Sequence, residues 1–227
     1  MELGISLELE AWKLELSPHH STTPSPHFPA MSAVSETIVR EYFELHEFLV
    51  RQHRKYIVQA RGEDDDIDFF VLNPHPQTRG EPMPFVLASP DLPFLERAIV
   101  VVKGWHTETF STARLEHAPE IFRFVEPKVF QQAARAFGKE VTPLKVLVVP
   151  ALPQSAQARD QSIGLLRSKG IDAVIPFRTM LTDLVSEVET NRNYQKSDLL
   201  QIIRILKNYD FFKEPQMELF KAKRKRK

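Results

Sequence analysis

The chain has 227 residues, of which 42% are hydrophobic and 26% charged, an ordinary globular composition with room for a sizeable core. It has no cysteine, which excludes disulfide scaffolds, zinc–thiolate and iron–sulfur sites, and cysteine nucleophiles. No apolar run is long enough to span a membrane, and acidic residues stand near the N-terminus where an export signal would be basic. The sequence therefore predicts a soluble, cytoplasmic protein that is not embedded in a membrane.

The formal net charge is zero, but the charge is unevenly distributed. Six of the last seven residues, 221–227, are basic, which leaves 24 basic and 30 acidic residues in the rest of the chain. Such a run can bind phosphates or a nucleic-acid surface in a salt-dependent way, or it can be only a solvated terminus. Residues 215–227 are therefore expected to form a basic C-terminal tail.

The N-terminal region has the composition of an extension. Residues 17–30 contain four prolines and few residues to bury, which is typical of a linker. Met31 stands directly before the first clear helix signal. We therefore expect residues 1–31 to be a disordered extension upstream of a functional protein that begins near Met31, and residues 32–214 to form one domain.

The first half of this domain shows one helix and several strands. Apolar residues at helical spacing after Ser35, a good N-cap, predict a helix over 36–48. Residues rich in β-branched and aromatic side chains predict three strands, at 56–58, 67–72 and 99–102. The long connection 73–96 contains six prolines, and we expect a binding loop or a small hairpin around Phe85–Leu87.

The second half alternates helices and strands. Glycines mark the ends of its first two predicted helices, at Gly138 and Gly170. The predicted elements are a helix over 127–138, a strand over 145–149, a helix over 155–169, a strand over 171–175, and helices over 178–189 and 197–208. This alternation indicates an α/β fold whose sheet is at least partly parallel, with the order α-β-β-β-α-β-α-β-α-α from Ser35.

Two charged residues flank the predicted central strands. Asp68 opens the strand over 67–72, and Lys103 follows the strand over 99–102. A carboxylate there can hold Mg²⁺ against a phosphate, and an ammonium group can orient an attacking water. Asp68 could instead cap a turn, and Lys103 could simply extend to solvent. The glycine-rich loops that cradle nucleotides and the G-x-S-x-G motif of hydrolases are absent from the sequence.

Together, this element order and these residues resemble the PD-(D/E)XK nuclease superfamily over roughly residues 35–176. The resemblance implies a restriction-endonuclease-like α-β-β-β-α-β core, in which a mixed central sheet is flanked by helices and followed by C-terminal helices. It implies Asp68 as a metal ligand, Lys103 as the catalytic lysine, Mg²⁺ or Mn²⁺ as the cofactor and nucleic acid as the substrate. The chain departs from the motif at Val101, where the family has a second carboxylate.

The residue at position 101 leaves several readings open. The missing acid could be supplied by Glu36, or less favourably by Glu41, on the first predicted helix, or by Glu108. Phosphates could be contacted by Lys128, by Arg135 and by the basic tail. We expect a metal-dependent phosphodiester hydrolase, with a catalytically inactive binding or interaction protein as the alternative and an unrelated α/β domain as a third reading. A homodimer stays open, because the two C-terminal helices could form an oligomer surface.

Overall fold

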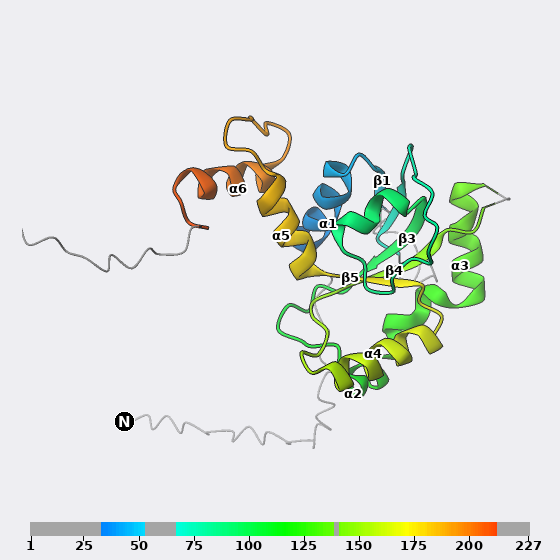
Figure 1. The fold of residues 1–227 in the computed structure, drawn as a ribbon. Helices are drawn as coiled ribbons and strands as arrows, with labels where there is room; N and C mark the ends of the chain where they lie inside the picture. The colour runs from blue at the N-terminus through cyan, green and yellow to red at the C-terminus, as the bar shows by residue number, and fades with distance from the viewer. Residues whose placement is uncertain (1–32, 53–66, 139–140, 213–227) are drawn as a thin grey trace, which may run out of the picture. The chain divides into compact units, whose positions relative to one another are not determined.

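The computed structural model describes residues 33–52, 67–138 and 141–212 (Figure 1). The chain divides into residues 1–30 and 31–227, and every described residue belongs to the second part. The predicted extension over 1–31, the strand over 56–58 and the basic tail over 215–227 lie outside the described residues. The division into extension, domain and tail therefore stays a prediction.

The described chain forms a mixed α/β structure with a five-stranded sheet. The helices are α1 (Ala33–Leu45), α2 (Thr112–Glu116), α3 (Pro127–Ala134), α4 (Ala156–Ser168), α5 (Phe177–Glu187) and α6 (Asp198–Asn208). The strands are β1 (Leu49–Gln52), β2 (Phe69–Leu72), β3 (Arg97–Val102), β4 (Leu144–Val149) and β5 (Ala173–Pro176). Three 3₁₀ helices complete the structure: η1 (Ser89–Phe94), η2 (Pro119–Val125) and η3 (Arg135–Phe137).

The strands lie in the order β1-β2-β3-β4-β5. The pairs β1–β2 and β2–β3 are antiparallel, whereas β3–β4 and β4–β5 are parallel. This arrangement confirms the predicted α/β class with a mixed sheet. The parallel direction makes β3, β4 and β5 end at one edge of the sheet, where the antiparallel β2 begins. We call this the carboxyl edge.

Helices cover both faces of the sheet, because the strand residues are apolar on both sides (Figure 1). One face packs against apolar side chains of α1, α5 and α6, and its strand residues include Phe69, Val71, Val100, Val102 and Val148. The other face packs against α2, η2, α3 and α4, and its strand residues include Phe70, Ile99, Val101, Leu147 and Val149. Most residues of the two central strands, β3 and β4, are consequently buried.

The segment Phe85–Leu87 does not form the predicted hairpin. Val86 instead makes an isolated parallel bridge with Val174 at the outer edge of β5. The Leu87 N–H donates to the Val174 carbonyl at 2.9 Å, and the Val174 N–H donates to the Phe85 carbonyl at 2.7 Å. The expected hairpin is wrong because β5 would otherwise expose an unpaired strand edge, and this apolar segment supplies its missing partners.

The two predicted glycine stops are confirmed. Gly138 has a φ of 98° and Gly170 a φ of 89°, both in the region that glycine adopts without a steric penalty. Gly170 follows α4, which begins at the N-cap Ser155, whose hydroxyl accepts from the Ala158 N–H at 3.4 Å. These two local signals therefore determine where α4, the helix before β5, begins and ends.

Candidate functional site

Asp68 is buried at the carboxyl edge, directly before β2, with 7% of its surface exposed. Its carboxylate oxygen Oδ2 accepts from the Val102 N–H at 2.7 Å, and its own N–H donates to the Val100 carbonyl at 3.2 Å. The carboxylate thus extends the hydrogen bonding between β2 and β3 to the residue before the start of β2. A buried acid in this position has a structural task, whatever chemistry it also carries.

Lys103 follows β3 at the same edge. The Lys103 N–H donates to the Val148 carbonyl of β4 at 3.0 Å, and its side chain is half-buried. Because the Asp68 carboxylate contacts the amide of Val102, it lies one residue from Lys103 along the chain. The two residues that the sequence singled out therefore lie at the same edge of the sheet, on neighbouring strands.

Val101 occupies the place where the family motif carries a second acid. The register between β2 and β3 ends at the pair Phe69–Val100, so Val101 is the first residue of β3 beyond it. Val101 is 1% exposed and packs among apolar side chains. Side chains alternate along a strand, so Val101 and Lys103 point to the same face of the sheet. An apolar side chain therefore fills the position that would complete a pair of carboxylates.

Glu36 reaches this edge only from the opposite face. It lies in the first turn of α1, and its carboxylate accepts a hydrogen bond from the Gln52 side chain. Gln52 is paired with Phe69 in the sheet, next to Asp68. The start of α1 is also tied to the loop after Lys103, since the Ser35 hydroxyl and His106 Nε2 are 2.9 Å apart. Glu36 is thus near the edge but engaged with Gln52.

The other predicted acids have ion-pair partners of their own, and the predicted bases are exposed. Glu41 is buried and pairs with Arg40 at 3.2 Å, and Glu108 pairs with Arg114 at 3.6 Å. Two basic residues, Lys128 on α3 and Arg135 on η3, are exposed.

Among the described residues, the predicted metal site offers a single carboxylate ligand. Across residues 33–52, 67–138 and 141–212 no group of three or more His, Asp or Glu side chains is placed to hold a metal. Asp68 is a single carboxylate. Mg²⁺ in phosphate-processing sites is often bound through one or two carboxylates plus oxygens of the substrate and water. One carboxylate therefore meets the minimum for such a site.

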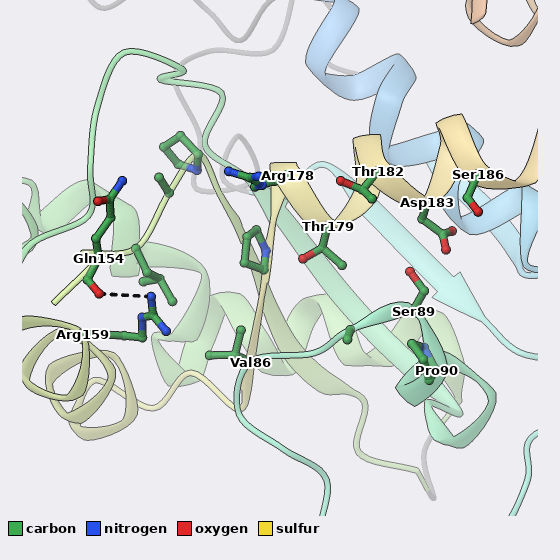
Figure 2. Close-up of a pocket in the computed structure, with 15 residues that line it drawn as sticks. Val86, Ser89, Pro90, Gln154, Arg159, Arg178, Thr179, Thr182, Asp183 and Ser186 are labelled. Carbon is green, nitrogen blue, oxygen red and sulfur yellow. Dashed lines mark hydrogen bonds between the residues drawn. The ribbon is translucent and has the colours of Figure 1, made fainter. Parts of the chain in front are cut away.

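A cavity of about 760 Å³ opens at the carboxyl ends of β4 and β5 (Figure 2). Its walls come from segments that are distant in sequence: the bridge to β5, the loop after β4, the first turn of α4, and α5. The lining residues are Val86, Ala88, Ser89, Pro90, Pro150, Ala151, Leu152, Gln154, Arg159, Pro176, Arg178, Thr179, Thr182, Asp183 and Ser186. Sequence reasoning missed this cavity, although ligands often bind where parallel strands end, and Arg178 follows β5 directly.

Buried polar groups support the floor of this cavity. Tyr42 on α1 is fully buried, and its hydroxyl lies 3.1 Å from the Ser89 hydroxyl. Burial raises the pKa of Tyr42 well above its usual value, and the nearby carboxylates of Asp183 and Asp91 raise it further, against a smaller lowering by the Ser89 hydrogen bond. Asp183 is itself paired with His46, with 2.6 Å between Oδ2 and Nε2.

Comparisons of the chain with protein-family models, with curated proteins and with solved structures found no match. Among the helices that the structure describes, none has the length and apolar character needed to cross a membrane.

Proposed function

We propose that this chain is a nucleic-acid-processing protein of the PD-(D/E)XK type, which hydrolyses phosphodiesters with Mg²⁺ or Mn²⁺. The observation that carries the proposal is the contact of the Asp68 carboxylate with the Val102 amide, 2.7 Å away, immediately before Lys103. The order of elements from α1 to β4, one helix, three strands, helices and a fourth strand, also supports it. This order is the one that the resemblance implies.

Each residue has a defined task in this proposal. Asp68 would hold the metal together with a phosphate oxygen of the substrate, and Lys103 would orient the attacking water. When bound, the ion supplies Lewis-acid stabilisation of charge on the phosphate. Glu36 is the nearest replacement for the missing second acid, because Gln52 holds its carboxylate at the strand that pairs with β2.

A second candidate is a catalytically inactive protein that keeps this fold for binding. The burial of Val101, which is 1% exposed, favours it, because an apolar side chain there leaves Asp68 without its usual partner. Fold alone does not confer activity. The two candidates differ in whether a metal and a cleavage reaction are present, and the binding or interaction protein leaves the class of partner open.

Plasmid nicking in Mn²⁺ separates the two candidates. We expect the full chain to nick supercoiled DNA, and Asp68→Asn and Lys103→Met to lose this activity by at least about 100-fold, the usual scale for losing a positioned catalytic group. Asp172→Asn is the matched control, because the Asp172 carboxylate also accepts from a backbone amide, that of Lys145 at 2.8 Å. Wild-type protein without nicking activity, or nicking that survives Asp68→Asn, would exclude the hydrolase.

A further inference from the structure

The cavity at the ends of β4 and β5 is open to a ligand and carries unequal charge. Three of its lining residues are charged: Arg159, Arg178 and Asp183. Asp183 already has a partner, since its Oδ2 lies 2.6 Å from His46 Nε2. Two guanidinium groups therefore face one carboxylate that already has a partner, which makes the cavity suitable for an anion.

The two arginines are held differently. Arg159 Nε donates to the Pro153 carbonyl at 3.1 Å and its Nη2 to the Gln154 carbonyl at 3.5 Å, so this guanidinium is fixed while other N–H groups remain for a ligand. The Arg178 guanidinium is on an exposed residue at the start of α5 and makes no hydrogen bond or ion pair with any residue that the structure describes. In Figure 2, Gln154 and Arg159 lie at one end of the cavity, Arg178 lies at the start of α5, and Asp183 and Ser186 lie farther along α5.

The rest of the wall suits the other parts of a nucleotide. Its apolar members are Val86, Ala88, Pro90, Pro150, Ala151, Leu152 and Pro176. These can pack against a base or a sugar, and three exposed or half-buried hydroxyls on α5, those of Thr179, Thr182 and Ser186, can donate to polar groups. The volume of about 760 Å³ lies within the roughly 300–1,000 Å³ of small-molecule sites.

The cavity and the Asp68–Lys103 pair share one edge of the sheet. Lys103 bonds to Val148 of β4, and Pro150, two residues further along, lines the cavity. From β3 to β5 there are two strand spacings, about 10 Å in total. An extended strand of nucleic acid that passes Lys103 can therefore reach Arg178 within a few nucleotides.

We propose that this cavity binds a nucleotide of a single-stranded nucleic acid at the carboxyl edge of the sheet, with Arg178 and Arg159 supplying the positive charge that attracts its phosphate. The identity of the polymer rests on the proposed function, whereas the anion site rests on the cavity itself. The same chemistry would accept a free nucleotide, and the experiment has a separate arm for that source.

The test is fluorescence anisotropy of a short fluorescein-labelled oligothymidylate with the full chain in EDTA, where no cleavage occurs. We expect Arg178→Ala to weaken binding by about tenfold, the effect of losing one charge-assisted contact. Arg192→Ala is the matched control: Arg192 is 68% exposed, pairs with Glu189 and lies outside the cavity. It should change binding less than twofold. All variants keep the basic tail, so any contribution of the tail to oligonucleotide binding is the same in each.

A second variant removes no charge. Thr182→Trp fills the cavity from an exposed position on α5. We expect it to weaken binding of the oligonucleotide at least fivefold and to leave the circular dichroism spectrum unchanged. Displacement of the oligonucleotide by adenosine monophosphate, dependent on Arg178, would identify a site for single nucleotides. Absence of such displacement would show that the site requires a strand.

Equal affinities of Arg178→Ala, Thr182→Trp and Arg192→Ala would overturn the cavity as the site, even if the protein nicks DNA. Conversely, Arg178-dependent binding without any nicking would leave the cavity in place and exclude the hydrolase. The two proposals can therefore fail separately.

Discussion

Replacing Asp68 tests whether its carboxylate holds the edge of the sheet as well as a metal. Asp68→Ala removes the acceptor of the Val102 N–H, 2.7 Å away, and leaves this buried donor unpaired. Leaving such a donor unsatisfied costs about 1–3 kcal/mol, and hydrogen bonds to charged groups lie in the upper half of this range. We therefore expect Asp68→Ala to lower the free energy of unfolding by about 2–3 kcal/mol.

Asp68→Asn separates the two tasks of this side chain. The asparagine oxygen can still accept from Val102, so we expect a loss of less than about 1 kcal/mol, although the charge that would bind a metal is gone. The assay is urea unfolding followed by circular dichroism. A loss below about 0.5 kcal/mol for Asp68→Ala, or equal losses for the two variants, would refute a structural role for the Val102 hydrogen bond.

Two further predictions concern local conformation and pH. Gly170→Ala forces a φ of 89° on alanine and should destabilise the protein by about 1 kcal/mol, whereas Gly164→Ala, inside α4 with nothing within 4 Å of the added methyl, should stabilise it by about 0.5–1 kcal/mol. Equal effects in thermal unfolding would contradict this. Because burial raises the pKa of Tyr42, its phenol keeps its proton in the folded state after the unfolded chain has lost it. The unfolding free energy should therefore fall above about pH 10 by about 1.4 kcal/mol per pH unit, and Tyr42→Phe should remove this contribution. Urea unfolding at several pH values would measure how the unfolding free energy depends on pH. The same dependence in the wild type and in Tyr42→Phe would refute this role of Tyr42.

The parts of the fold that local sequence determines were predictable. β3 and β4 have uninterrupted runs of apolar, mostly β-branched residues, which are buried on both faces. Gly170 marks the end of α4 because its conformation is costly for other residues. The position of Asp68 and Lys103 at one edge was also predictable, because each adjoins a strand whose direction follows from the order of elements.

The features that sequence reasoning missed depend on pairing between distant segments. β1 has the sequence LVRQ and is mostly exposed, so it becomes a strand only through its ladder with β2. The segment around Val86 pairs with Val174, 88 positions away in sequence, and no local signal distinguishes this from a hairpin. The cavity needs this pairing, the loop after β4 and α5 together, so its residues could not be collected from the sequence.

The central claim, that Asp68 holds a metal in a phosphodiester hydrolase, is tested most directly by calorimetric titration of Mn²⁺ into the wild type and into Asp68→Asn. Urea unfolding of Asp68→Asn, followed by circular dichroism, is done first to establish that this variant is folded. We predict a saturable heat of binding in the wild type that is absent in Asp68→Asn. The absence of binding in the wild type, or the same binding in both proteins, would contradict the claim and leave the fold as a binding protein.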